Sequence, residues 1–237
     1  MQLTSEKKQL KAILTRLATA YGEPVWRDPL PPIDELVSTI LSQNTNDVNR
    51  DRAFNALVKR YPDWYSVMNS PEQEIIETIR VAGLANQKGP RIKAVLQQIY
   101  AETGALDLAF LADLPLEDAR SWLLRFKGVG LKTAAIVLQF SLNRPAFPVD
   151  THIYRVTGRL GLRPEKMDVD KTHHLMEELA DPHDYYAGHL NLIRLGREVC
   201  HRLVVVLSTA QLAEREQRRT TILRRARAAQ RPLQGLL

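Results

Sequence analysis

Apolar residues recur at intervals of three and four along nearly the whole 237-residue chain, and this period restricts the fold more than any other feature. The spacing puts apolar side chains on one face of an α-helix, and no stretch sustains the apolar–polar alternation of a strand. We therefore predict an all-α protein. The predicted helices span residues 1–24, 33–43, 46–61, 71–83, 87–102, 117–126, 131–142, 150–162, 169–180 and 185–200.

Capping residues set several of the predicted helix ends. Asn46 or Asp47 is expected to cap the helix that follows, because short polar side chains accept hydrogen bonds from free N–H groups. Pro71 favours a helix start and Gly83 a helix end, since proline suits the first turn and glycine adopts the left-handed conformation beyond the last. The next helix is expected to start near Pro90.

Composition places the chain among soluble globular proteins. Apolar residues make up 44% and charged residues 25%, and no apolar run approaches the roughly eighteen residues of a membrane span. The N-terminal segment has the pattern of an amphipathic helix and not of a signal peptide. The single cysteine, Cys200, excludes an internal disulfide and suits a reducing compartment. We expect a cytoplasmic, nucleoid-associated monomer with no membrane partner.

The net charge of +6 is concentrated at one end of the chain. Residues 201–237 carry eight arginines and two glutamates, so the first 200 residues hold 25 basic and 25 acidic side chains of the 33 and 27 in total. A nucleic acid would therefore be bound by a local arrangement of groups and not by the bulk charge of the body.

The segment FKGVGLKTAAIVL, residues 126–138, is the most informative motif. Gly128 and Gly130 separate two predicted helices, which gives a helix-hairpin-helix over about residues 117–142. Glycines let the backbone come close to a ligand, and the hairpin amides with the free N–H groups of the next helix form a nest for a DNA phosphate. For Gly-x-Gly alone, a plain turn between two core helices is the better explanation.

Other segments of the chain, which occur in a fixed order, indicate that this motif is more than a plain turn. The chain resembles the helix-hairpin-helix (HhH-GPD) DNA glycosylase superfamily, in its endonuclease III branch, over roughly residues 5–200. The resemblance rests on ILSQNTND at 40–47, GLANQK at 83–88, GVGLKTA at 128–134, VDTHIYRV at 149–156 and LGREVC at 195–200.

The resemblance implies a base-excision-repair glycosylase with abasic-site lyase activity, typically on oxidised pyrimidines. Lys132 matches the family's amine nucleophile, and its unfavourable place at a helix start would help to keep the amine neutral. Asp150 matches the catalytic aspartate, which stabilises positive charge on the sugar and moves protons around the amine. Asp150 is also expected to cap the helix that starts at Thr151, while His152 is expected to be structural.

The resemblance also implies residues that contact duplex DNA containing a damaged base or an abasic site. A base must be flipped out for chemistry, and Gln43 matches the residue that enters the vacated space and bonds the orphaned partner base. Leu84 matches an apolar wedge on the opposite loop. The hairpin residues expected at the phosphate are Lys127, Gly128, Val129, Gly130 and Thr133.

The fold implied by the resemblance has two helical lobes flanking a DNA cleft. Residues 31–146 would form a six-helix lobe with the hairpin, and residues 1–30 would join 147–200 in a second lobe. Lys132 and Asp150 would then face each other from different lobes. Residues 201–237 would form an atypical basic tail.

Two alternatives compete with the lyase. An adenine-type monofunctional glycosylase lacks the lysine and uses a glutamate near the place of Thr39, so the presence of Lys132 disfavours it. A non-catalytic or impaired helix-hairpin-helix DNA-binding protein would need neither Lys132 nor Asp150.

The chain departs from the family after Cys200. Most members of the branch hold a [4Fe–4S] cluster on four cysteines, and here Cys200 is the only surviving candidate ligand, so the cluster is predicted to be absent. No cofactor is required for the chemistry. The tail is explained by a true loss of the cluster with a new basic helix, by a solvated extension, or by a shifted reading frame near codon 202.

Overall fold

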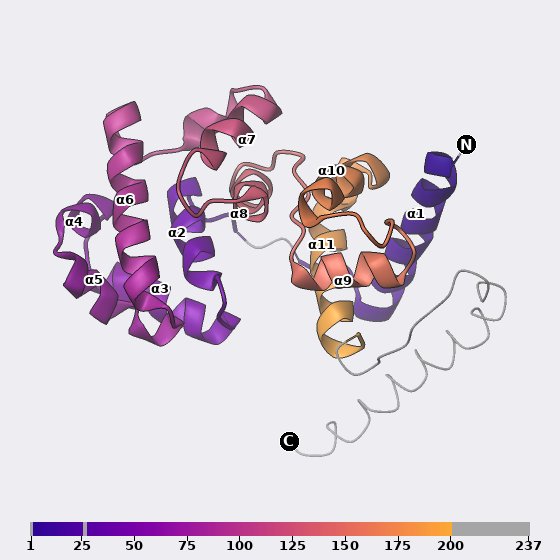
Figure 1. Cartoon of the computed structure of the whole chain (residues 1–237), viewed down its shortest axis with the longest axis horizontal. Coiled ribbons are helices and arrows are strands. Elements are labelled where there is room, and N and C mark those ends of the chain that lie inside the picture. Colours follow the sequence, from indigo (N-terminus) through magenta and orange to yellow (C-terminus); the bar gives the residue numbers. More distant parts are fainter. Residues whose placement is uncertain (1, 26–27, 201–237) are drawn as a thin grey trace, which may run out of the picture. The chain divides into compact units, whose positions relative to one another are not determined.

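The structure, a computed structural model, describes residues 2–25 and 28–200. Within this part of the chain all regular structure is helical and no strand forms, which confirms the predicted all-α fold (Figure 1). The predictions about the basic tail at 201–237 lie outside the described residues. No helix among the described residues is both long and apolar enough to cross a membrane.

The described chain divides into two compact units. One consists of the described residues up to Val25 together with those from Val149 to Cys200, and the other is the intervening chain up to Pro148. The intervening unit, which we call the hairpin unit, contains α2 (Pro32–Ser42), α3 (Asp47–Arg60), α4 (Trp64–Asn69), α5 (Glu72–Thr78), α6 (Ala85–Thr103), α7 (Leu116–Leu124) and α8 (Leu131–Ile136). Its shorter turns are η1 (Arg80–Ala82), η2 (Ala109–Ala112) and the π-helical η3 (Val137–Ser141).

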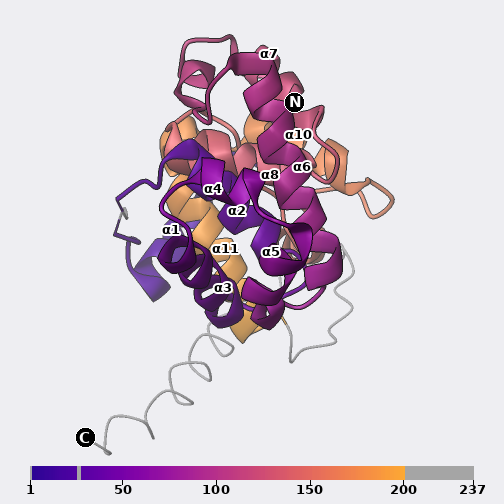
Figure 2. The same ribbon diagram turned by 90° about the vertical axis from the view of Figure 1, so that its left-hand side faces the viewer.

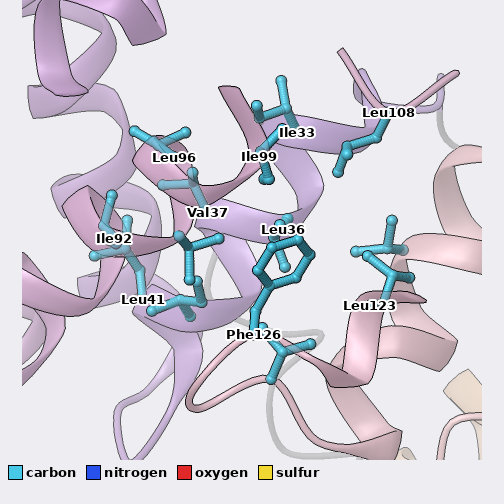
Figure 3. Packing of buried hydrophobic residues seen from close by; sticks show 14 of the residues in the cluster. Ile33, Leu36, Val37, Leu41, Ile92, Leu96, Ile99, Leu108, Leu123 and Phe126 are labelled. Carbon is cyan, nitrogen blue, oxygen red and sulfur yellow. The ribbon is translucent and has the colours of Figure 1, made fainter. Parts of the chain in front are cut away.

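Helix α2 forms the centre of the hairpin unit. It packs against α3, α6 and α8. It lies between α6 and α8 in Figure 1, and α3 lies below it both there and in Figure 2. Every residue of α2 from Glu35 to Leu41 is buried, so the polar side of the helix at Glu35, Ser38 and Thr39 is covered as well as its apolar stripe. Leu36 and Leu41 lie in the core cluster with Phe126, at the start of the hairpin (Figure 3).

The other unit, which we call the terminal unit, joins the two ends of the described chain. It contains α1 (Gln2–Tyr21), α9 (Thr151–Arg159), α10 (Val169–Leu179), the short turn η4 (Pro182–Asp184) and α11 (Tyr185–Glu198). Helix α11 packs on both α1 and α9. The apolar stripe expected on the first helix is buried at Leu10, Ile13 and Leu17.

Two of the predicted helix ends are confirmed. Asn46 caps α3, because its side-chain oxygen accepts a hydrogen bond from the N–H of Asn49 at 2.8 Å. Gly83 ends η1 at a positive φ of 67°, a conformation that glycine adopts without steric cost.

The predicted start near Pro90 was wrong. Helix α6 begins at Ala85 and carries Pro90 inside it. Gly89 lies so close to α5 that an added Cβ would be 2.7 Å from Ile76 Cγ1, so tertiary packing of the first turns outweighs the local preference of proline. The segment at 71–83 forms α5 and η1 in place of one helix, the segment at 131–142 forms α8 and η3, and the short α4 was not predicted.

Candidate nucleic-acid interface

The hairpin between α7 and α8 is a tight turn held at both ends by buried side chains. Phe126 and Val129 are both buried, and the N–H of Val129 donates to the carbonyl of Phe126 at 3.0 Å. Gly128 occupies the third position of the turn at φ +86°, as in type II turns, where glycine is favoured. The two anchors leave Lys127, Gly128 and Gly130 exposed at the surface.

The start of α8 presents backbone N–H groups beside this turn. Gly130 is the N-cap and offers no side chain to accept from them, so an external anion can satisfy them. The side chains of Val129 and Thr133 are buried. At those two predicted phosphate contacts, only the backbone is available for a ligand at the surface.

Gln43 is tied to the hairpin by hydrogen bonds at both ends of its amide. It follows the last residue of α2, its Nε2 donates to the carbonyl of Gly128 at 3.0 Å, and its Oε1 accepts from Arg91 Nη1 at 2.6 Å. Arg91 lies over Gly128 so closely that an added Cβ on the glycine would be 2.3 Å from Arg91 Nε. The structure thus joins Gln43 and the hairpin, two elements predicted separately.

Leu84 has an unusual backbone conformation and an exposed side chain. Its φ of 50° and ψ of 31° are left-handed, and 46% of its surface is exposed. Left-handed conformations are strained for non-glycine residues and cluster at functional sites. An apolar side chain held outward at a structural cost is consistent with the predicted wedge.

Lys88 connects the two loops that carry Gln43 and Leu84. Its buried ammonium donates to the carbonyls of Leu41 and Ala82, both at 2.8 Å. Each carbonyl lies two residues before one of the predicted inserting residues. Burial, with a smaller contribution from the charge of Arg91, lowers the pKa of Lys88.

Lys88 and Arg91 were missed by the sequence reasoning. Both lie in or next to the quoted segment GLANQK, but a lysine or arginine near a helix start is usually solvated. Only their hydrogen-bond partners distinguish them. Lys88 binds carbonyls 47 and 6 residues away in sequence, and Arg91 binds a side chain 48 residues away.

Lys132 occupies the second position of α8 and is half-buried in the hairpin unit. The first turn of α8 contains no acidic residue. The partial positive charge at the start of a helix disfavours an additional cation, which is the basis for predicting a reactive amine at this position.

Asp150 lies in the terminal unit directly before α9 and is its N-cap, as predicted. One carboxylate oxygen, Oδ1, accepts from the N–H of Ile153 at 2.8 Å. The cap fixes the side chain and leaves the second oxygen for other chemistry. Next to it, His152 Nδ1 lies 3.0 Å from Arg155 Nη2, and its Cβ lies close to Gly196. Because arginine only donates, this Nδ1 accepts, in keeping with the structural role expected for His152.

The residues present do not fit an iron–sulfur cluster. A [4Fe–4S] cluster needs four thiolates, and the chain contains one cysteine, the half-buried Cys200. Among the described residues, one group of possible metal ligands comes together, at Asp181, His183 and Asp184. Asp181 forms a surface ion pair with Lys11, and Oδ1 of Asp184 lies 3.2 Å from Nε2 of His183.

Comparisons with known proteins identify the family of the chain. The family model described as HhH-GPD superfamily base excision DNA repair protein matches residues 37–182. Endonuclease III of Thermotoga maritima is 30% identical over 171 residues, which cover 71% of this chain and 75% of that protein. A protein of Arabidopsis thaliana, named only provisionally as a DNA glycosylase, is 41% identical over 150 residues. That match covers 63% of this chain and spans about half, 51%, of the relative.

Solved structures show the same fold. A non-covalent complex of endonuclease III with DNA has a TM-score of 0.70 at 24% identity and covers 82% of this chain and 87% of that one. A 3-methyladenine DNA glycosylase of H. pylori has a TM-score of 0.66 at 21% identity, with 84% and 99% covered. At this identity the likeness establishes the fold and leaves the substrate open.

Proposed function

The chain belongs to the HhH-GPD superfamily of base excision DNA repair proteins, in its endonuclease III branch, and from this premise we propose a bifunctional enzyme. The proposed enzyme excises oxidised pyrimidines from duplex DNA and cleaves the resulting abasic site. The observation that carries the proposal is Lys132, an amine in the first turn of the helix that immediately follows the hairpin.

The hairpin suits the grip on the DNA backbone. Its exposed part consists of Lys127 and two glycines, so backbone N–H groups and one ammonium can approach a phosphate without a large side chain between them. The part of the chain that the structure describes has little net charge. Hydrogen-bond donors that point at a phosphate are therefore more important for binding DNA than attraction by the overall charge. Gln43 and Leu84, on neighbouring loops of the same unit, supply a polar and an apolar side chain for the space left by a flipped base.

In the proposed reaction the neutral amine of Lys132 attacks the sugar carbon that carries the damaged base. The bond from that carbon to the base breaks, and the base leaves with the electron pair and takes up a proton. The nitrogen lone pair then forms a double bond to the same carbon while the bond from this carbon to the ring oxygen breaks, and the ring oxygen takes up a proton released by the amine. The result is an opened sugar held as a Schiff base. Loss of the neighbouring sugar proton expels the 3′ phosphate by elimination, and water hydrolyses the Schiff base to release the enzyme.

Asp150 supports these steps through its carboxylate. Its charge stabilises the positive charge that develops on the sugar as the base departs, and it can accept protons from and return them to the reacting groups. The hydrogen bond from the N–H of Ile153 holds the carboxylate in place at the start of α9. No step in this sequence requires a metal or a cluster.

Borohydride trapping tests the proposal. The purified protein is incubated with duplex DNA containing an abasic site and reduced with borohydride, which converts the Schiff base into a stable protein–DNA adduct. Wild-type protein is expected to form the adduct and Lys132→Ala to form none. Lys127→Ala is the matched control, because it removes a lysine of the same hairpin and is expected to weaken binding while leaving the adduct at saturating DNA. Absence of an adduct from folded wild-type protein would refute the lyase and favour a DNA-binding role.

A further inference from the structure

Three groups of the hairpin unit form a continuous hydrogen-bonded chain. Arg91 Nη1 donates to Gln43 Oε1 at 2.6 Å, and Gln43 Nε2 donates to the carbonyl oxygen of Gly128 at 3.0 Å. The chain joins the start of α6 to the C-terminal end of α2 and to the hairpin. Its middle member is the residue proposed to enter the space of a flipped base.

The two outer groups allow only one orientation of the Gln43 amide. A guanidinium has donors and no acceptor, and a backbone carbonyl is only an acceptor. The oxygen of the amide must therefore point toward Arg91 and the nitrogen toward Gly128. A reversed amide would place N–H groups against the guanidinium and an oxygen against the carbonyl, which loses both bonds.

Both outer groups are themselves held in place. Arg91 follows Lys88 by one turn of α6, and the ammonium of Lys88 anchors that turn to the carbonyls of Leu41 and Ala82. Gly128 has no Cβ, and an added one would be 2.3 Å from Arg91 Nε, so only glycine lets the arginine lie this close to the hairpin.

We propose that Arg91 is a positioning residue that fixes the amide of Gln43 and thereby decides which base opposite the lesion is accepted. This inference rests on the proposed function, because it assigns Gln43 to the orphaned partner base. Arg91 itself need not touch the DNA.

The fixed amide retains a defined pairing pattern. After its two internal bonds, Gln43 has one lone pair left on Oε1 and one N–H left on Nε2. The pairing edge of adenine presents an N–H donor at N6 and an acceptor at N1, and guanine presents an acceptor at O6 and a donor at N1. The two patterns are reversed relative to each other, so a fixed amide matches one purine, whereas a freely rotating amide matches either.

Equilibrium binding to non-reacting duplexes tests this inference. Each duplex contains tetrahydrofuran, a stable abasic-site analogue, opposite one of the four bases, with an undamaged duplex as reference. The variants are Arg91→Met, Gln43→Ala and the double substitution. Arg60→Met is the matched control, because Arg60 is an exposed arginine of the same unit whose guanidinium binds Glu74. Thermal unfolding establishes that each variant is folded.

Wild-type protein is expected to prefer one opposite purine by about tenfold, near the low end of what a correctly paired side chain discriminates. Arg91→Met should reduce the preference to about twofold or less, and Gln43→Ala should abolish it. The double variant should match Gln43→Ala, because the arginine acts only through the glutamine. Arg60→Met should keep the wild-type ratio. If Arg91→Met does not fold, Arg91→Lys is used; it keeps the charge without the planar fork and should give an intermediate ratio.

Some outcomes overturn the inference and leave the proposed function intact. The first is a wild-type protein that binds the abasic duplexes tightly and shows no preference for the opposite base. The second is an Arg91→Met or Arg91→Lys variant that keeps the full preference. The third is an Arg91 variant that binds the abasic duplexes more tightly than wild type does. A different outcome, no preference of the wild type for abasic over undamaged duplex, refutes the proposed DNA function itself.

Discussion

Gly128→Ala is expected to destabilise the hairpin unit for two separable reasons. The first is backbone strain, because alanine at φ +86° costs about 1–2 kcal/mol relative to an unstrained conformation. The second is the clash of the new Cβ with the side chain of Arg91, at 2.3 Å from Nε and 2.5 Å from Cδ. The arginine is flexible and will move away, so the cost is the loss of its hydrogen bond to Gln43.

The size of the second contribution follows from that bond. A hydrogen bond to a charged group contributes about 1.5–3 kcal/mol, and partial exposure of Arg91 and Gln43 to solvent reduces this to about 1 kcal/mol. Gly128→Ala should therefore lower the free energy of unfolding by about 2–3 kcal/mol in total.

Two other glycines of the same unit separate the contributions. Gly104 has φ +73° and no atom within 4 Å of an added Cβ, so Gly104→Ala carries the strain alone. Gly130 has φ −102° and equally open surroundings, so Gly130→Ala should change stability by less than about 0.5 kcal/mol. Urea unfolding of all three variants, in wild-type and Arg91→Met backgrounds, gives the comparison. The reasoning is refuted if Gly128→Ala costs no more than Gly104→Ala, or if its excess cost persists without Arg91.

Three further predictions concern other parts of the site. Lys88→Met should be less stable than wild type, because two buried carbonyls lose their donor. The native pKa of Lys88 lies below its unfolded value of 10.5, so the unfolded state binds more protons than the native state at a pH between these two values. The stability of wild type relative to Lys88→Met should therefore rise with pH through that window, and parallel pH profiles in urea unfolding would contradict the lowered pKa. Asp150→Ala should lose about 1 kcal/mol of stability, because it removes the cap of α9. Asp150→Asn should keep the cap and still turn over abasic DNA about a hundredfold or more slowly than wild type. Equal turnover of Asp150→Asn and wild type would exclude a role for the charge. The purified protein should contain no iron and show no absorption near 400 nm, because Cys200 cannot hold a cluster alone, and a brown protein with about four iron atoms per chain would contradict this.

The helices could be predicted from the sequence because their signals are local. The three-and-four spacing of apolar residues, the cap at Asn46 and the glycine at Gly83 each act within one or two turns. The helix at 64–69 escaped prediction because six residues are too few to establish a period. The start of α6 was misplaced at Pro90 because the packing of Gly89 against Ile76, a tertiary contact, overrides the local signal.

Short-range spacing along the chain is enough to predict the all-α fold, the hairpin at Gly128 and Gly130 and the position of Lys132 two residues after it. The hydrogen bonds that join Gln43 to the hairpin and to Arg91, which lie 85 and 48 residues away in sequence, depend instead on how the helices pack. The same packing places the buried ammonium of Lys88 between the two loops that carry Gln43 and Leu84. A hydrogen bond depends on the positions and directions of two groups in space, and for groups so far apart in the chain these are set by how the helices pack and not by the residues between them.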